Sequence, residues 1–475
     1  MQIISSLLEK KPNILQYIGN HSEFLDGVEK SNAKIFLTAD RIVIKIRLTE
    51  DAMRKQISFT IVDHSSTLCE DEVARACRER QVLLERVLAG EKRYEGVLGW
   101  YHPELFASDG RIDRILRLSR DLREKVDTLV VIGIGGSNQG ARGAIEALKP
   151  EGGIPIVWAG NTLSSFESAR TLAALEGHTF AIDVIAKNFE TLEPGLAFRL
   201  FRGELERRYG AGASRYIYVT GTPGSHLEEL AGTQGYTFLE FPAPVGGRYS
   251  MFTDVGLLPM AASGIDVRAM AEGAREMAGW LQGDHSPDNL ALRYAVARNL
   301  LSRRGFELEM LTFFEPRFDY FARWWRQLLA ESEGKEGKGL FPVASSDSED
   351  LHSIGQYVQE GKKILFETFL RLGACGGPEL RLASDGVDDR FGYLDGKTVS
   401  EVNKASEAAT LKAHSAKFPC LVFDVPALDA YQYGALSYFF LFSTYLSGSI
   451  LGINPFDQEG VEAYKHWMFQ ALGKC

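Results

Sequence analysis

Residues 128–148 read TLVVIGIGGSNQGARGAIEAL and determine the fold class that we expect. The first five residues are mostly apolar and β-branched, as in a buried strand. A glycine-rich turn follows, and the residues from 139 to 148 favour a helix. A strand that passes through a tight turn into a helix is the unit from which covered parallel sheets are built. This stretch therefore predicts an α/β protein.

The same alternation of strands and helices continues on both sides of this stretch. We predict strands at 155–159, 180–185, 216–220, 308–313 and 420–424, and helices at 113–126, 192–209 and from Val267 onward. A chain of 475 residues is too long for one ordinary domain. We expect two α/β domains, each a mostly parallel sheet covered by helices. The first and smaller domain spans 111–265, the second and larger spans 266–475, and residues 1–110 pack on the larger one.

Composition narrows the class of protein. Hydrophobic residues make up 45% of the chain and charged residues 24%, which is typical of a soluble globular protein. The formal charge of -10 argues against non-specific nucleic-acid binding, yet a local basic pocket can still hold an anion. The five cysteines are scattered and have no CxxC spacing. We therefore expect no disulfide framework, no zinc site and a reducing compartment.

Two segments bear on whether the protein is secreted, membrane-bound or cytosolic. The N-terminus, MQIISSLLEKKPNIL, is interrupted by Lys-Lys-Pro and lacks the apolar core of a secretory signal. Residues 434–453 carry no charge and are long enough to span a bilayer. They also contain serines, glycines and tyrosines and lead directly into a polar segment. We expect a helix buried in the α/β core, with a membrane span as the second interpretation, and a cytosolic protein.

The turn GIGGSNQG at 133–140 offers backbone N–H groups and the positive end of a helix to an anion. It is not a dinucleotide fingerprint, because the sixth position of the G-x-G-x-x-G pattern is Asn138. The next strand ends in Val-Trp-Ala-Gly without an acidic residue, and the turn contains no Gly-Lys-Ser/Thr of a P-loop. A nicotinamide oxidoreductase is therefore disfavoured. Taken alone, the glycines would indicate only a tight structural turn.

Two further motifs carry ionic side chains. GGRYS at 246–250 places Arg248 after two glycines, and an always-charged forked donor suits a developing oxyanion. QLLAESEGK at 327–335 sets Gln327 and Glu331 one helical turn apart, so both can lie on one face at the end of a helix. Glu331 is then a candidate base. We expect Glu333 and Glu336 to be surface charges.

Two more motifs lie nearer the C-terminus. DLHSIGQ at 350–356 carries His352, a group whose ordinary pKa lies near neutrality. FDQEGVEAYK at 456–465 brings a carboxamide, a carboxylate and an ammonium together as Gln458, Glu462 and Lys465. A lone histidine is usually structural, and glutamine and lysine commonly cap helices. The order of the motifs along the chain is what makes them informative.

Together the motifs resemble the phosphoglucose isomerase family, in the family's order, from about Gly99 to Lys465. The resemblance implies two sugar-isomerase (SIS-type) domains, a sugar phosphate substrate, no metal and no redox cofactor. It implies an aldose–ketose isomerase that interconverts glucose 6-phosphate and fructose 6-phosphate through ring opening and a cis-enediol. It also implies a homodimer or higher homo-oligomer.

The resemblance assigns roles to the candidate catalytic residues. His352 and Lys465 would open the sugar ring, with His352 contributed across a dimer interface. Glu331 would carry the proton from C2 to C1. Arg248, with Gln327 nearby, would stabilise the charge of the enediol intermediate.

The substrate-binding residues implied by the family are Gly136, Ser137, Lys187, Asn188, Thr191, Gln327 and Gln458. The loop AKNFETLE at 186–193 departs from the family's Ser/Thr-rich pattern, because Ala186, Asn188 and Glu190 replace hydroxyl residues. Asp254 is a second departure, since the family favours a small residue there. We expect phosphate to be held more weakly than the family pattern implies. The alternatives are an isomerase with altered sugar or phosphate specificity and a non-catalytic sugar-phosphate-binding protein.

Overall fold

The computed structural model describes residues 36–37, 42–43, 56–384 and 386–474. The chain forms two compact units, Met1–Gln56 and Ile57–Cys475. In the first unit the described residues are two short antiparallel strands, β1 (Phe36–Leu37) and β2 (Ile42–Val43). Most of the N-terminal part of the predicted 1–110 segment lies outside the described residues. The second unit contains the two sheets described below.

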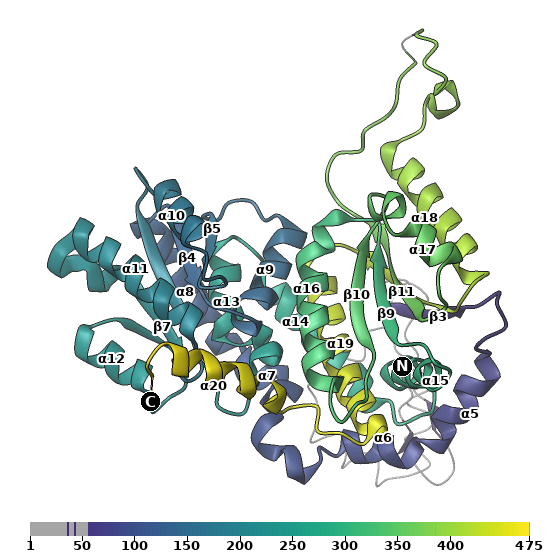
Figure 1. Cartoon of the computed structure of the whole chain (residues 1–475), viewed down its shortest axis with the longest axis horizontal. Coiled ribbons are helices and arrows are strands. Elements are labelled where there is room, and N and C mark those ends of the chain that lie inside the picture. The colour runs from purple at the N-terminus through teal and green to yellow at the C-terminus, as the bar shows by residue number, and fades with distance from the viewer. Residues whose placement is uncertain (1–35, 38–41, 44–55, 385, 475) are drawn as a thin grey trace, which may run out of the picture. The chain divides into compact units, whose positions relative to one another are not determined.

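The first sheet has five parallel strands in the order β5-β4-β6-β7-β8 (Figure 1). The strands are β4 (Thr128–Ile132), β5 (Ile156–Ala159), β6 (Phe180–Ile185), β7 (Ile217–Gly221) and β8 (Thr237–Glu240). The helices of this region are α8 (Asp109–Lys125), α9 (Gly136–Leu148), α10 (Ser165–Ala174), α11 (Leu192–Tyr209), α12 (His226–Gln234) and α13 (Asp254–Ala262). This is the predicted α/β repeat.

Both faces of the first sheet are buried, as the apolar sequence of β4 requires. Successive side chains of a strand point to opposite faces. Leu129 and Val131 belong to the core shared with α8 and α9, whereas Val130 and Ile132 pack in the core that contains Phe198 of α11. All five residues of β4 are buried. A fully covered parallel strand of this kind carries no polar side of its own.

The second sheet has the order β10-β9-β11-β12-β3. Its strands are β9 (Leu308–Phe313), β10 (Phe341–Ser346), β11 (Leu365–Ala374), β12 (Cys420–Ala427) and β3 (Ser58–Val62). The first four are parallel, and β3 pairs antiparallel with β12. A strand from the predicted N-terminal segment thus completes the sheet of the predicted larger domain.

Helices of the second region carry several of the candidate site residues. They are α14 (Val267–Gly283), α15 (Leu290–Arg303), α16 (Asp319–Glu333), α17 (Gly355–Glu360), α18 (Val399–Ser415), α19 (Ala430–Leu451) and α20 (Glu462–Ala471). Before the first sheet come α5 (Glu70–Glu79), α6 (Gln81–Leu88) and α7 (Pro103–Phe106). Short 3₁₀ turns connect these elements, among them η4 (Gly247–Phe252) and η6 (Asp350–His352).

The expected core helix is α19. It is long and apolar enough to cross a membrane, but 89% of its most apolar window is buried inside the protein. Its side chains pack among aromatic residues of the second sheet, including Phe439 against Phe423 of β12. A helix that is apolar all round and enclosed by protein is a core helix.

All strands of the first sheet precede residue 265 and the four parallel strands of the second sheet follow it, whereas β3 of the second sheet comes from the N-terminal segment; the boundaries at 110 and 265 stay predictions. The four parallel strands β9 to β12 of the second sheet have the same spatial order as β4 to β7 of the first sheet. In both, the second strand lies on one side of the first and the third lies on the other. In open α/β sheets, ligands bind at the carboxyl ends of the strands where the order reverses. That rule points to two crevices, one between β4 and β6 and one between β9 and β11.

Candidate active site

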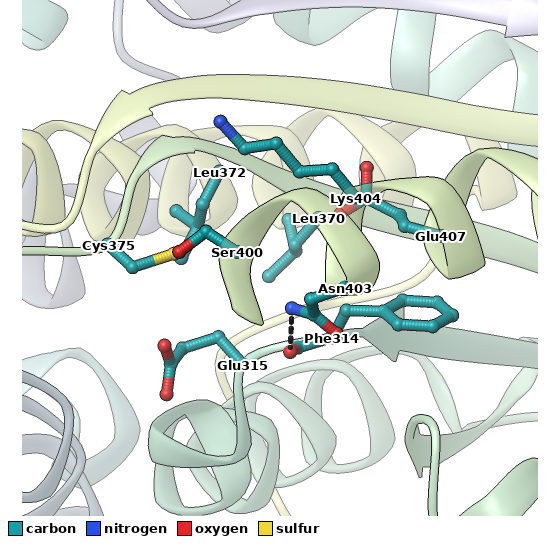
Figure 2. A pocket seen from close by; sticks show the side chains of 9 residues that line it. All are labelled: Phe314, Glu315, Leu370, Leu372, Cys375, Ser400, Asn403, Lys404 and Glu407. Atoms are coloured by element: carbon teal, nitrogen blue, oxygen red, sulfur yellow. Dashed lines mark hydrogen bonds between the residues drawn. The ribbon is translucent and has the colours of Figure 1, made fainter. Parts of the chain in front are cut away.

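The crevice of the second sheet is largely filled by protein (Figure 2). Asn403 of α18 donates a hydrogen bond to the Phe314 carbonyl just after β9, at 3.0 Å. The Glu315 carboxylate is occupied by Arg317, with N–O distances of 2.9 and 3.0 Å. The cavity that remains measures about 30 Å³, which is room for little more than a water molecule. A sugar phosphate therefore does not fit there.

The crevice of the first sheet brings two of the predicted motifs together. The GIGGS turn follows β4, and an added Cβ at Gly136 would lie 1.9 Å from the Gly247 carbonyl oxygen. The same Cβ would lie 2.6 Å from the Arg248 nitrogen. Only glycine permits this approach of two backbones. The turn therefore packs directly on GGRYS.

A third motif meets the same turn. Gly135 has a φ of 60°, the left-handed region that glycine tolerates, and a Cβ there would lie 2.8 Å from Nε2 of Gln327. Gln327 lies on α16, one turn before Glu331. The glycine turn thus contacts the helix that carries the candidate base.

Arg248 is the centre of the cluster and is only 2% exposed. Its guanidinium donates hydrogen bonds to Ser332 Oγ (2.8 Å), Glu331 Oε2 (3.2 Å), Gln458 Oε1 (3.0 Å), the Pro455 carbonyl (2.6 Å) and the Asp457 carbonyl (3.2 Å). These partners come from the ends of α16 and from the FDQ segment. A forked group with five N–H donors can satisfy all of them at once.

Glu331 lies in the last turn of α16 with its carboxylate held from two sides. Oε2 accepts from Arg248 at 3.2 Å, and Oε1 accepts from Gln327 Nε2 at 3.0 Å. The side chain remains 32% exposed. An oriented carboxylate that is still reachable from outside has the geometry of a general base.

Three residues of this cluster were missed by sequence reasoning. Ser332 links Arg248 to Tyr249, whose hydroxyl lies 3.0 Å from Ser332 Oγ. The Trp324 indole donates to the Arg248 carbonyl at 3.1 Å. Ser332 and Tyr249 stand beside Glu331 and Arg248 within the same motifs, and that adjacency was the available signal.

The prediction that Glu333 is a surface charge is wrong. Glu333 is 1% exposed and forms a bidentate ion pair with Arg298, at 2.7 and 3.1 Å. Burial disfavours the charge of Arg298, but Glu309 and Glu333 together raise its pKa well above the usual value. The pair anchors the end of α16 immediately after the candidate base.

Lys335 fixes the segment that carries Gln458. Its ammonium lies 2.7 Å from Asp457 Oδ1 and donates to the Asp457 carbonyl at 2.8 Å and to the Asn454 carbonyl. Burial lowers the pKa of Lys335, and the bond to Asp457 opposes that shift. Gln458 is thereby positioned against Arg248.

The two predicted ring-opening groups lie outside this set of contacts. Lys465 is in α20, where its ammonium pairs with Glu462 at 2.6 Å and its side chain is 32% exposed. His352 ends the turn η6 after β10 and is exposed. Their roles stay predictions.

Lys187 of the loop after β6 contacts two backbone carbonyls, and its predicted role in substrate binding stays a prediction. Its ammonium donates to the carbonyls of Ala243 (2.9 Å) and Val245 (3.0 Å), just before GGRYS. Burial lowers the pKa of Lys187. Lysine has three donors, so one remains for a ligand. Its interaction with these carbonyls holds the loop against the Arg248 motif.

The other predicted phosphate-binding residues lie at or near the N-termini of α9 and α11. Ser137 is in the first turn of α9, and Thr191 precedes α11 without capping it. Asn188, Glu190 and Thr191 are exposed. Because β4 and β6 are adjacent and parallel, both helices begin at one edge of the sheet. Two sets of unpaired N–H groups there suit a phosphate.

The second sequence departure, Asp254, lies outside the cluster of Arg248 contacts. It is 1% exposed at the start of α13 and pairs with Arg114 at 3.4 Å. Burial raises its pKa. Its side chain stabilises the end of β8 through the Glu240 N–H, at 3.4 Å.

No grouping of three histidine, cysteine or carboxylate side chains suited to a metal ion occurs among the residues that the structure describes.

We expect Glu190→Thr to lower the Michaelis constant for a phosphorylated sugar about threefold to tenfold, because a nearby like charge costs about 1 kcal/mol. Ala186 is only 7% exposed, so serine there would place its hydroxyl mostly inside the protein. Initial-rate kinetics at low and high salt would test the charge effect, which salt should weaken. Glu206→Gln, at the far end of α11, is the matched control. An unchanged constant at low salt would show that the loop does not face the phosphate.

Comparison with known proteins agrees with this geometry. A sequence model described as phosphoglucose isomerase matches residues 121–367. The glucose-6-phosphate isomerase of Clostridioides difficile is 44% identical over 392 residues, covering 79% of this chain and 87% of the relative. That of Bacillus cytotoxicus is 42% identical over 434 residues, covering 88% and 94%.

Solved structures show the same fold. A hypothetical protein from Thermus thermophilus superposes with a TM-score of 0.78 at 26% identity, covering 87% of this chain and 100% of that one. A glucose-6-phosphate isomerase from Chlamydia trachomatis has a TM-score of 0.74 at 19% identity, covering 95% of each chain. The matched model covers just over half of the chain, and the curated relatives, at 42–44% identity, cover 79% and 88% of it, so the chain belongs to the phosphoglucose isomerase family.

Proposed function

We propose that this protein interconverts glucose 6-phosphate and fructose 6-phosphate. The observation that carries the proposal is the oriented Glu331 carboxylate, held by Arg248 and Gln327 beside the glycine turn of the first sheet. Its curated relatives bear the name of this activity. The reaction moves one proton between neighbouring carbons and requires no net oxidation.

The central step is proton transfer by Glu331. The carboxylate takes the proton from C2 of the open-chain aldose, the electrons of the C–H bond form the C1–C2 double bond, and the carbonyl electrons move to O1. The proton of the C2 hydroxyl passes to O1 through the cis-enediol, and Glu331 returns its proton to C1, which leaves a ketone at C2. Arg248 carries a permanent positive charge in a buried position, where it stabilises the negative charge that develops on the sugar oxygen.

Substrate binding and ring opening involve residues around the Glu331–Arg248 pair. The first turns of α9 and α11 offer N–H groups to the phosphate, and Gln458 is positioned to meet a sugar hydroxyl. Ring opening needs a proton to move between the ring oxygen and the hydroxyl at C1. His352 and Lys465 are the groups that we assign to that step.

A substrate panel tests the proposal directly. Glucose 6-phosphate, glucose and other phosphorylated sugars are incubated with the protein without added nicotinamide, and ketose formation is measured. We expect fructose 6-phosphate from glucose 6-phosphate alone. Binding without turnover would instead indicate a sugar-phosphate-binding protein, and preference for another sugar would indicate an isomerase of altered specificity.

We further propose that two chains assemble so that His352 of one completes the site of the other. His352 is exposed on its own chain. Between β11 and α18 an extended segment projects from the second sheet (Figure 1). It carries exposed apolar side chains, Leu380, Phe391 and Tyr393, which are 63%, 55% and 68% exposed. Such side chains favour burial against a second chain.

Mixing two inactive variants tests this assembly. His352→Ala and Glu331→Gln chains, exchanged in equal amounts, form hybrids that contain one intact site. Random exchange makes about half of the dimers hybrid, so about a quarter of wild-type activity should return. Mixing Glu331→Gln with Arg248→Lys chains is the matched control, because both groups belong to one chain's site. If verified exchange restores no activity to the first mixture, the shared site is refuted.

A further inference from the structure

A second cavity lies at the amino ends of strands in the second sheet, away from the carboxyl ends discussed above. Its volume is about 460 Å³, within the size range of small-molecule pockets, about 300–1,000 Å³. Lys362 and Lys363 line it just before β11, and Lys417 lines it between α18 and β12. We refer to it as the lysine pocket. Two segments that are far apart in the sequence thus bring three ammonium groups to one concave site.

The three lysines of the pocket have no acidic partner in the part of the chain that the structure describes. Among the residues that the structure describes, no aspartate or glutamate lines the cavity, and none forms an ion pair with these three lysines. Asp63 is adjacent to the pocket residue His64 in sequence, but its carboxylate accepts from its own loop. Oδ1 binds the Ser65 N–H at 2.7 Å, and Oδ2 binds the Leu68 N–H at 2.6 Å.

This arrangement is unusual in a chain whose formal charge is -10. Acidic proteins have carboxylates available to pair with surface lysines. Bringing like charges together without a partner is unfavourable unless an anion joins them. The excess of lysine is therefore local to the cavity and is not a property of the whole surface.

The rest of the lining suits a small polar ligand. His64 is held by a 2.8 Å contact between Nδ1 and Ser415 Oγ, and its second ring nitrogen can still donate or accept. Val358, Leu365 and Phe418 are buried and form an apolar floor. A rigid floor with mobile ammonium groups at the rim can adjust to an anion of variable shape.

We propose that the lysine pocket binds a small polyanion with two or more phosphate or carboxylate groups. Three separate ammonium groups favour a multivalent anion over a single phosphate. The cavity is concave and modest in size, which favours a small molecule over a nucleic-acid strand. The site is distinct from the isomerisation site, because it lies at the amino ends of β11 and β12 in the second sheet, whereas Glu331 and Arg248 lie beside the glycine turn of the first sheet.

Calorimetric titration with inorganic pyrophosphate tests the proposal on the full chain. Saturating fructose 6-phosphate is present throughout, so that the isomerisation site is filled. The test variant is Lys362→Gln/Lys363→Gln/Lys417→Gln. We expect the wild type to bind one pyrophosphate per chain and the triple variant to bind at least about tenfold more weakly, because three charges that attract the anion are removed. Affinity should fall as salt rises.

A second triple variant controls for overall charge. Lys92→Gln/Lys125→Gln/Lys397→Gln removes the same charge from exposed lysines elsewhere and should bind like the wild type. Thermal melting checks that both variants are folded. The proposal is overturned if the wild type does not bind pyrophosphate while fructose 6-phosphate is present. Equal weakening in the two triple variants would overturn it as well, by showing a general charge effect.

Discussion

Glu331→Gln is expected to lower the turnover of glucose 6-phosphate by roughly two or more decades and to leave substrate binding largely intact. Glutamine keeps the size of the side chain, and its carbonyl oxygen can still accept from Gln327. It cannot take up a proton, so the transfer from C2 to C1 loses its carrier. The loss should therefore appear in kcat, with the Michaelis constant little changed.

Two measurements make this result specific to proton transfer. Glucose 6-phosphate deuterated at C2 should lose the label from C2 in the wild type, to C1 of the product or to solvent, and retain it in the variant. Glu336→Gln removes a carboxylate from the following loop, where Glu336 is exposed and pairs with Lys338 at 2.8 Å. That control should keep wild-type turnover. Near-normal kcat in Glu331→Gln would refute the assignment of the base.

The strands that sequence reasoning located correctly are the strongly apolar ones. The predicted ranges 180–185 and 308–313 coincide with β6 and β9. Strands β8, β10 and β11 were not predicted, and β10 shows why. Its sequence FPVASS is short, contains proline and ends in small polar residues, so no periodic pattern indicates a strand. It becomes a strand because β9 supplies its hydrogen-bonding partners in the folded chain.

Contacts between residues close in sequence could be predicted from their spacing. Buried ion pairs between residues far apart in sequence could not. The spacing of Gln327 and Glu331 placed both on one helical face, and their side chains do meet at 3.0 Å. Nothing near Glu333 in sequence indicates that Arg298 will bury it. Their pairing depends on how α15 and α16 each pack against α19, which is a tertiary property.

Lys187 illustrates a similar limit. The family pattern implied a phosphate ligand, yet the folded loop directs its ammonium to two carbonyls before GGRYS. A lysine side chain is long, and the backbone carbonyls that it reaches are about 56 residues away in the chain. The sequence places Lys187 in the loop after β6, but it does not indicate that the ammonium contacts the carbonyls of Ala243 and Val245.

Arg248→Lys is expected to lower turnover by roughly two or more decades and to lower the melting temperature as well. The buried guanidinium of Arg248 donates hydrogen bonds to five oxygen atoms. Lysine has three donors and cannot form a fork, so some of these acceptors lose their partners. A buried carbonyl such as that of Pro455 costs about 1–3 kcal/mol when left unsatisfied. The contact that orients Glu331 is weakened by the same change.

The readouts separate the catalytic loss from the structural one. Arg317→Lys is the matched control, because Arg317 binds the Glu315 carboxylate and the Cys375 carbonyl in the filled crevice of the second sheet. It should lower the melting temperature with little change in kcat, whereas Arg248→Lys should lower both. If Arg248→Lys loses only stability and retains turnover at a temperature where it is folded, Arg248 is a structural anchor and the enediol charge is stabilised by another group.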